Sequence, residues 1–303
     1  MDKKIAIIIC SYNQKELLED CLKSIKKNTL YKNYKVYFVD DSGNGEIAKE
    51  VKKYFPWVDV SINKKNLGFS KSNNVGIKKA IKEYSPDYFL LLNDDTEIID
   101  KKWIQKMIKS GEEDEKIGIL GCKIIYPDGS LQNLGGYLRK WKIELENDEN
   151  KKRVFEVDHI MGAFLMIKKE VIKDIGILDE EFSPYLLEDT DYCLRAKKKG
   201  WKIVSVPEVK TIHKKGKSID SQENKKSLLV RFKNDIIFSK KHLKGWNKFF
   251  RIFIYLPLVA IFRKKKDQDK LKLSKFRLRR NFLRNLGLWF IAFFPKIYEN
   301  KLK

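Results

Sequence analysis

Two short acidic segments carry the side chains of this 303-residue chain that are best suited to chemistry. Segment 93–97 reads NDDTE and places Asp94 beside Asp95, whereas 185–195 reads YLLEDTDYCLR and holds three carboxylates. Adjacent carboxylates repel each other unless a cation lies close by, and Mg²⁺ or Mn²⁺ takes oxygen ligands that substrate phosphates complete. A carboxylate that stands apart from its neighbours can act as a general base. The first segment therefore favours a metal site, and the second favours a base.

Helix capping does not account for Asp94 and Asp95. The next helix is predicted to begin near Asp100, which can serve as its N-cap. The alternative for this segment is a solvated turn, because Asp and Asn are common in turns.

The second acidic segment has the pattern of a helix that ends near Gly200. On such a helix Asp191 and Arg195 are i,i+4 partners, and on an exposed surface their pair contributes a few tenths of a kcal/mol, roughly. Glu188 lies on the same side as Asp191, while Asp189 is turned away from it. That isolation suits a base. An acidic helix start that only favours the helix dipole is the alternative.

The elements that position these residues alternate between strand and helix over the first 100 residues, which predicts a mostly parallel sheet covered on both faces. The predicted strands are 4–10, 35–42, 58–63 and 87–95, and the predicted helices are 14–28, 46–55 and 70–84. Polar loops follow each strand, and ligands bind at the carboxyl ends of strands in such sheets. A further strand pattern at 201–209 returns His213 to the same edge.

Charge is concentrated in the last quarter of the chain. Residues 225–303 hold 23 Lys and Arg against 4 Asp and Glu, a net charge of +19, which leaves +4 for residues 1–224. The apolar runs within 249–262 and 285–296 are shorter than the roughly 20 residues of a spanning helix. Aromatic residues mixed with Lys and Arg favour basic, amphipathic helices that lie on an anionic membrane surface. A helical hairpin packed on the catalytic domain, or a dimer contact, is the alternative.

The cysteines and the N-terminus bear on the compartment. The cysteines are Cys10, Cys21, Cys122 and Cys193. They show no CxxC spacing and no nearby His, so they indicate buried thiols in a reducing compartment and neither a zinc site nor a redox pair. The apolar run 5–10 is too short for a signal peptide. We expect a cytoplasmic protein, peripheral on the inner face of the cell membrane.

Seven sequence blocks between about residues 3 and 218 carry a resemblance to a known family. They read SYNQ, VDDSGNG, NLGFSKSNNVGI, LLNDDTEI, YPDGSLQNLGG, MGAFLMIKKEVIKDIGILDEEFSPYLLEDTDYCLRAKKKGWKI and HKKGKS. In this order they resemble the family-2 inverting glycosyltransferases of the GT-A fold, in particular the rhamnosyltransferase-like branch. The resemblance implies an α/β, Rossmann-like catalytic domain at 1–224, with a nucleotide-sugar half at about 1–115 and an acceptor half at about 116–224.

The resemblance also implies roles for individual residues. Asp189 matches the catalytic base, and Asp95 and His213 match the residues that hold a divalent metal, Mg²⁺ or Mn²⁺. Asp41 would accept the N–H of uracil or thymine. The residues implied to contact the donor are Cys10, Ser11, Tyr12, Asn13, Asp41, Asn66, Gly68, Asn74, Asn93 and Asp94.

The implied activity is metal-dependent, inverting transfer of a sugar from a UDP- or dTDP-linked donor to a hydroxyl of a glycan or lipid-linked acceptor, in cell-surface polysaccharide synthesis. Asp94 departs from the Pro that many relatives have at this position. The QxxRW block of processive relatives does not occur, which favours a single transfer per encounter. The alternative is a basic nucleic-acid- or membrane-binding protein on a nucleotide-binding fold without transferase activity. We expect no nucleic-acid partner, because the acidic edge would repel phosphate without a metal and the sequence shows no nucleic-acid-binding motif. Residues 139–153 lack periodicity and predict an irregular flap.

Overall fold

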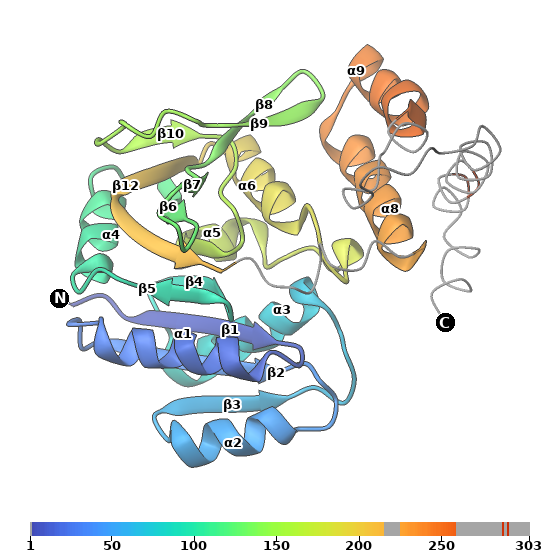
Figure 1. The fold of residues 1–303 in the computed structure, drawn as a ribbon. Coiled ribbons are helices and arrows are strands. Elements are labelled where there is room, and N and C mark those ends of the chain that lie inside the picture. The colour runs from blue at the N-terminus through green and yellow to red at the C-terminus, as the bar shows by residue number, and fades with distance from the viewer. Residues whose placement is uncertain (1, 215–224, 259–286, 288–289, 291–303) are drawn as a thin grey trace. The chain divides into compact units, whose positions relative to one another are not determined.

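The computed structural model describes residues 2–214, 225–258, 287 and 290. The chain divides into two compact units, Met1–Lys215 and Gly216–Lys303 (Figure 1). Most of the apolar run 285–296 and the end of the block HKKGKS lie outside the described residues, as does residue 224, where the catalytic domain was predicted to end.

The first unit is built around one mixed sheet. Its strand order is β10-β12-β6-β11-β4-β1-β2-β3, with β5 paired to β12 and β7 paired to β6. The quartet β3-β2-β1-β4 is parallel and contains the four strands predicted from the sequence. The strands of this sheet are β1 (Ile5–Ser11), β2 (Tyr34–Asp40), β3 (Val58–Ile62), β4 (Tyr88–Asn93), β5 (Thr96–Ile98), β6 (Ile117–Ile125), β7 (Leu131–Asn133), β10 (Phe155–Val157), β11 (Phe164–Lys168) and β12 (Lys202–His213).

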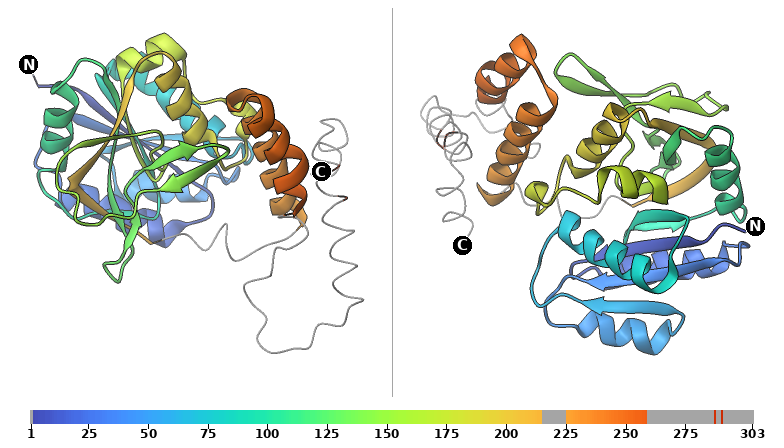
Figure 2. Two further views of the ribbon diagram at one scale, coloured as in Figure 1. Left: turned by 90° about the horizontal axis from the view of Figure 1, so that it is seen from above. Right: turned by 180° about the vertical axis from the view of Figure 1, so that it is seen from behind.

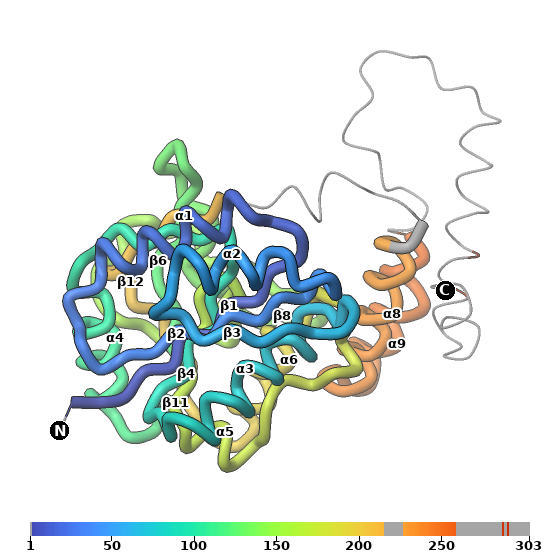
Figure 3. The backbone as a smooth tube through the Cα atoms, turned by 90° about the horizontal axis from the view of Figure 1, so that it is seen from below, coloured from blue at the N-terminus to red at the C-terminus, as the bar shows by residue number. Residues whose placement is uncertain are grey.

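Helices cover both faces of this sheet (Figures 2 and 3). Alternate strand residues point to opposite faces. Ile5, Ile7 and Ile9 pack with α1, α2 and α4, whereas Ala6 and Ile8 pack with α3, α5 and α6. The helices are α1 (Lys15–Lys27), α2 (Glu46–Tyr54), α3 (Phe69–Tyr84), α4 (Trp103–Glu112), α5 (Lys169–Ile175) and α6 (Glu188–Lys198), and a 3₁₀ turn, η1, spans Glu180–Phe182.

One antiparallel strand, β11, joins the two parts of the sheet. It lies between β4 and β6 and runs against both, so β4 and β6 run in the same direction. Because β12 is parallel to β6, it ends at the same edge as β4. The short strand β5 then pairs with the end of β12, which places His213 opposite Thr96.

The segment predicted to be an irregular flap contains a hairpin instead. β8 (Gly136–Arg139) and β9 (Lys142–Leu145) pair antiparallel, and Lys140 takes a positive φ at the turn. The prediction missed the short alternation of charged and apolar residues in KIEL, which is the period of a strand.

The structure corrects two further expectations. Helix α4 begins at Trp103, and Asp100 is not its N-cap; the Asp100 carboxylate instead accepts the Lys102 N–H at 2.9 Å and pairs with Lys106. Helix α6 does place Asp191 beside Arg195, but the Asp191 side chain is 0% exposed. The pair was expected on an exposed helix face, whereas this face of α6 packs inward.

The described part of the second unit is helical. It consists of α8 (Lys225–His242), α9 (Gly245–Phe249) and the π-helical turn η2 (Phe250–Tyr255). Within it Arg251 pairs with Asp235 at 2.5 Å. In the portion of the chain that the structure describes, we find no helix with the length and apolar character needed to cross a membrane.

Replacing Asp191 with Ala should lower the free energy of unfolding by about 3–5 kcal/mol, because breaking a buried ion pair leaves the other charge uncompensated. Arg195 Nε donates to Asp191 at 2.8 Å, and its terminal nitrogens also bind the Ile175 and Ile177 carbonyls. Urea unfolding measures the loss.

The control for this prediction is Glu19→Ala. Glu19 pairs with Lys23 at 3.1 Å on the exposed face of α1. Its removal should cost only about 0.3–0.5 kcal/mol. Equal losses in the two variants would contradict the buried role of Asp191.

Candidate active site

Four polar loops gather at the carboxyl edge of the parallel strands. The strand ends are adjacent in the sheet, and the Asp41 N–H donates to the Ser11 carbonyl at 2.9 Å, which joins the first two loops. Tyr12 is 49% exposed, and Asn13 has a φ of 58°. Cys10 lies behind them, where burial, Asp41 and Asp94 together raise the pKa of its thiol. The loop predicted to hold the nucleotide therefore combines the Cys10 thiol, whose pKa is raised, with the exposed aromatic side chain of Tyr12.

Asp41 organises the neighbouring loop. Its Oδ1 accepts the Asn63 side-chain N–H and the Leu67 backbone N–H, both at 2.8 Å. Its Oδ2 accepts the Gly68 backbone N–H at 2.9 Å. A carboxylate has about four lone-pair positions, so one on Oδ2 is left for a further donor such as a base N–H. Contact with the donor's base stays a prediction.

The other residues implied beside the donor differ in their surroundings. Asn66 is exposed. Gly68 has a φ of 82°, and a Cβ there would come within 2.4 Å of Pro184 Cα. Asn74 is buried, donates to the Leu178 carbonyl at 2.9 Å and accepts the Leu178 N–H at 3.1 Å. Asn74 therefore holds α3 against the segment that leads to α6, and a direct contact with the donor stays a prediction.

The two predicted metal-binding residues lie side by side. His213 Nε2 is 3.0 Å from Asp95 Oδ1, and both residues are buried. Gln132 Oε1 lies 2.8 Å from His213 Nδ1. If Nδ1 donates this bond, Nε2 presents its lone pair toward Asp95, which is the arrangement of a metal-binding histidine. The Asn93 side-chain nitrogen is 3.3 Å from the same Nε2.

The side-chain atoms of Asp95 and His213 fit a divalent ion whose coordination shell is completed by other ligands. Neighbouring ligands about 2.1 Å from an octahedral Mg²⁺ are about 3 Å apart, which is the spacing of Asp95 and His213. Burial, and then the charge of Asp95, raise the pKa of the Asp94 carboxyl to about 7. A nearby cation would favour its ionised form. Among the described residues, no three His, Cys, Asp or Glu side chains group closely enough to enclose a metal by themselves.

The carboxylate of Asp189 lies at the start of α6 and bonds to the segment before β11. Its Oδ2 accepts the Gly162 N–H at 2.8 Å, and its Oδ1 accepts the Thr190 N–H at 2.6 Å. The next residue, Ala163, accepts the Asn93 N–H at 3.1 Å. Consecutive residues 162 and 163 thus bind the acidic segments at 188–191 and 93–97, which are almost 100 residues apart in sequence.

The backbone just before Asp189 is strained. Leu186 and Leu187 have φ values of 82° and 71°. Bulky residues rarely adopt the left-handed region, and such conformations occur mainly where the surrounding structure enforces them at functional sites. This observation favours a functional start of α6 over a simple acidic cap.

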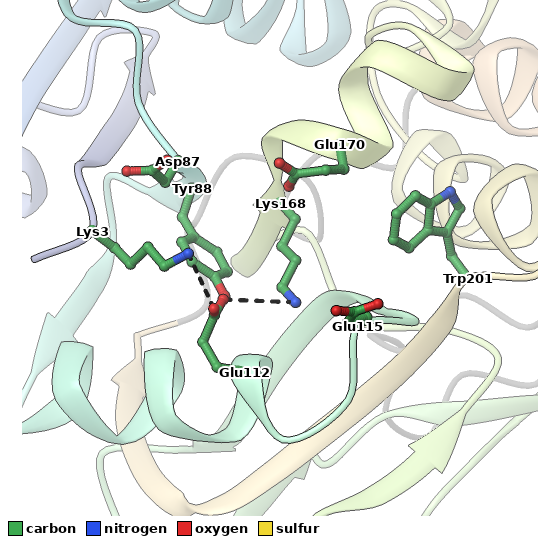
Figure 4. Close-up of a pocket in the computed structure, with 8 residues that line it drawn as sticks. All are labelled: Lys3, Asp87, Tyr88, Glu112, Glu115, Lys168, Glu170 and Trp201. Carbon is green, nitrogen blue, oxygen red and sulfur yellow. Dashed lines mark hydrogen bonds and ion pairs between the residues drawn. The ribbon is translucent and has the colours of Figure 1, made fainter. Parts of the chain in front are cut away.

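A different cavity, of about 370 Å³, lies at the opposite edge of the sheet (Figure 4). Lys3 pairs with Glu112 at 3.0 Å and Lys168 with Glu112 at 3.7 Å, so both lysines of the lining share one carboxylate. Its lining residues are Lys3, Asp87, Tyr88, Glu112, Glu115, Lys168, Glu170 and Trp201. Several of them precede the strands, so this cavity is separate from the carboxyl edge.

The family model for glycosyl transferase family 2 matches residues 6–176, more than half of the chain. The chain belongs to this family. It is 24% identical over 229 residues to the O-antigen biosynthesis protein RfbC of Myxococcus xanthus, which covers 69% of this chain and 17% of RfbC. It is 25% identical over 222 residues to the dTDP-rhamnosyl transferase RfbF of Shigella flexneri, with 70% of each protein covered. The chain also spans only 27% of the protein y4gI of Sinorhizobium fredii, at 24% identity over 79% of this chain.

Two solved structures show the fold. GalNAc-T7 with UDP, GalNAc and Mn²⁺ matches 93% of this chain and 54% of its own, with a TM-score of 0.61 at 14% identity. The mannosyltransferase PcManGT of Pyrobaculum calidifontis, in complex with GDP-Man and Mn²⁺, matches 96% and 88%, with a TM-score of 0.58 at 12% identity. The predicted GT-A fold is confirmed.

Several site residues were not identified from the sequence. Asn63 is the last residue of the predicted strand 58–63, and its position at the strand end was the only available signal. Gln132 lies in the block YPDGSLQNLGG, which contributed to the resemblance but received no role. Tertiary contacts determine the places of Gly162, His159 and Thr190 in the site, and no local sequence pattern predicts those contacts.

Gly68→Ala should destabilise the protein more than Gly129→Ala. Both glycines have a positive φ, which costs a residue with a Cβ about 1–2 kcal/mol, but nothing lies within 4 Å of a Cβ at Gly129. At Gly68 the Pro184 backbone must also move, so we expect a loss of about 3 kcal/mol or more. Thermal unfolding of the two variants measures the difference, and equal losses would contradict the close approach of Pro184.

Proposed function

We propose that this family member is a metal-dependent inverting glycosyltransferase. It would move a sugar from a nucleoside-diphosphate donor to a hydroxyl of a glycan or lipid-linked acceptor, in cell-surface polysaccharide synthesis. The observation that supports it best is the juxtaposition at residues 162–163. Gly162 binds Asp189, and Ala163 binds the loop that carries Asp95. A base and a candidate metal pair are thereby held around one short segment.

Asp95 and His213 are the residues that would hold the divalent ion, Mg²⁺ or Mn²⁺. When bound, such an ion supplies positive charge that offsets the charge developing on a departing diphosphate. GalNAc-T7 and PcManGT, which share the fold, were both solved with Mn²⁺. Gln132 would keep the His213 ring oriented.

Asp189 would act as the general base. The acceptor hydroxyl gives its proton to Asp189, its oxygen forms a bond to the anomeric carbon, and the bond from that carbon to the diphosphate oxygen breaks. Because attack and departure occur on opposite sides, the anomeric configuration inverts. No covalent bond between enzyme and sugar is required.

The donor is proposed to carry UDP or dTDP. RfbF is named as a dTDP-rhamnosyl transferase, and the GalNAc-T7 structure contains UDP, whereas PcManGT was solved with GDP-Man. UDP, dTDP and GDP should therefore be compared directly by thermal stabilisation in the presence of Mn²⁺. A ligand at a hundredfold excess over its dissociation constant stabilises a protein by about 2.7 kcal/mol.

Two variants should separate binding from chemistry. Asp95→Ala should abolish Mn²⁺-dependent binding of the preferred nucleoside diphosphate in calorimetric titration, because the carboxylate that faces His213 is lost. Asp189→Asn should retain that binding but lower transfer by about 10²- to 10⁴-fold, because an amide cannot take up the proton.

Asp100→Asn is the matched control, since Asp100 pairs with Lys106 away from the site. It should leave binding and transfer intact. Unchanged affinity in Asp95→Ala would refute the metal assignment. Full transfer by Asp189→Asn would refute the base.

The second unit is proposed to bind an anionic membrane surface. In its described part, Phe249 stacks on Trp246 and lies tilted against Phe253, with ring centroids 5.2 and 5.1 Å apart. The exposed fractions of Trp246, Phe249 and Phe253 are nevertheless 69%, 45% and 50%. Lys244 and Lys248 lie among them. Exposed aromatic side chains beside basic residues suit the interface between lipid headgroups and acyl chains.

Vesicle sedimentation tests this proposal. The full chain should sediment with vesicles that contain phosphatidylserine at physiological salt, and a chain ending at residue 224 should stay in the supernatant. The full chain with Trp246, Phe249 and Phe253 replaced by Ser should bind more weakly than the native chain. Equal sedimentation of all three proteins would show that this region does not bind the membrane, and preferential binding to DNA at the same ionic strength would favour a nucleic-acid role.

A further inference from the structure

A buried histidine lies behind the proposed base, linked to it by one hydroxyl. His159 Nδ1 is 3.1 Å from Thr190 Oγ1, and Thr190 Oγ1 is 3.2 Å from Asp189 Oδ1. His159 is 7% exposed and Thr190 is 3% exposed. The histidine precedes β11, whereas the other two residues begin α6, so the tertiary fold brings them together.

The hairpin β8–β9 holds the backbone of His159. The His159 N–H donates to the Gly136 carbonyl at 3.1 Å, and the Gly136 N–H donates to the His159 carbonyl at 3.0 Å. Asp158, the preceding residue, accepts the Leu138 N–H at 2.8 Å and pairs with Lys197 of α6. His159 is therefore fixed between the hairpin and the helix that carries the base.

Burial favours the neutral form of the His159 imidazole over the charged form. Burial lowers the pKa of His159, and the Asp189 carboxylate opposes that shift. Among the described residues of α6, the titratable groups close to Asp189 are Glu188, Asp191 and Cys193, and burial raises the pKa of Cys193. Asp191 is paired with Arg195. The neutral ring has one N–H, on either Nδ1 or Nε2.

The hydrogen bonds of the Thr190 hydroxyl determine which nitrogen of the His159 ring carries the proton. The hydroxyl has one proton, and an ionised carboxylate is only an acceptor. If the hydroxyl donates to Asp189, Nδ1 of His159 must donate to the hydroxyl. In the opposite arrangement two oxygens, 3.2 Å apart, would face each other with no proton between them.

The hydrogen bonds on Asp189 leave one position open. Oδ1 accepts from the Thr190 N–H and hydroxyl, and among the described residues Oδ2 accepts only from the Gly162 N–H. Of about four lone-pair positions on a carboxylate, the remaining one is therefore on Oδ2. That atom is the one that would receive the proton of the acceptor hydroxyl.

We propose that His159 is a positioning residue for the base, acting through Thr190: its Nδ1–H holds the Thr190 hydroxyl with its proton directed at Asp189 Oδ1, which leaves Oδ2 to take the proton of the acceptor hydroxyl. This inference rests on the proposed function, because it assigns a partner to the proposed base. The state of the His159 ring and the titration of Asp189 are both measured without donor or acceptor.

The first measurement is the tautomer of His159 by ¹⁵N NMR of the full chain at pH 7.5. The protein contains three histidines, which are His159, His213 and His242. Spectra of His213→Ala and His242→Ala therefore assign the signals by difference. We expect the proton on Nδ1 of His159. A proton on Nε2 would overturn the proposal.

The second measurement is the titration of Asp189, followed by its ¹³C-carboxyl signal and assigned with Asp189→Asn. Removing a hydrogen bond to a carboxylate favours its protonated form. Thr190→Val, which deletes the hydroxyl at nearly constant volume, should raise the midpoint of this titration by about 0.5–1 pH unit. His159→Leu should raise it in the same direction.

Conservative variants separate this role from a structural one. Thr190→Ser keeps the hydroxyl, and His159→Asn keeps an N–H close to the place of Nδ1, so both should keep the midpoint near that of the native protein. If Thr190→Val fails to move the midpoint, or if His159→Leu and His159→Asn give the same value, the proposal is wrong. Failure of donor binding or transfer would instead count against the proposed function.

Discussion

The site depends on the antiparallel placement of β11 between β4 and β6. This strand begins at the edge where the parallel strands end, so the peptide groups just before it lie among the polar loops. Gly162 reaches the Asp189 carboxylate, and Ala163 reaches the backbone of Asn93. The same strand sets the direction of β6 and hence of β12, whose last residue is His213. A different direction for β11 would separate the acidic segment at 93–97 from both His213 and Asp189.

The acidic residues buried in and around the candidate site are of two kinds. Asp191 is fully buried, and three hydrogen bonds from Arg195 to Asp191 and to backbone carbonyls satisfy the pair. Asp41 is likewise buried, and three N–H groups surround it. Such groups hold loops and helices in place, because a buried carboxylate without donors would be costly. Asp94 and Asp95 differ, since they lie side by side, and burial raises the pKa of Asp94 to about 7. That pair has the character of a site that receives a cation.

Predictions of secondary structure from local sequence patterns succeeded where the pattern was long and failed where the element was only a few residues long. The four predicted parallel strands and the helix at 188–198 are confirmed, because their apolar spacing extends over several residues. The hairpin at 136–145 was missed, since its strands are only four residues long and charged residues surround them. The Asp191–Arg195 pair was recognised from its spacing, but its burial was not, because the spacing of two residues on a helix does not tell which face packs inward. His159 gave no signal at all, as its partner Thr190 lies 31 residues away.

The sequence by itself determined the alternation of strands and helices, the positions of the polar loops at the strand ends, the resemblance to family 2 and the separation of charge between residues 1–224 and 225–303. These features follow from side-chain period, turn composition and motif order, all of which are local or linear. The resemblance already implied that Asp95 and His213 lie together. Only the tertiary structure decided which other distant residues meet: His213 with Gln132, Asp189 with Gly162, Thr190 with His159, and Gly68 with Pro184. Those contacts depend on the order and direction of the strands, and a single chain does not reveal that order, because any strand with two apolar faces can occupy any interior position of a sheet.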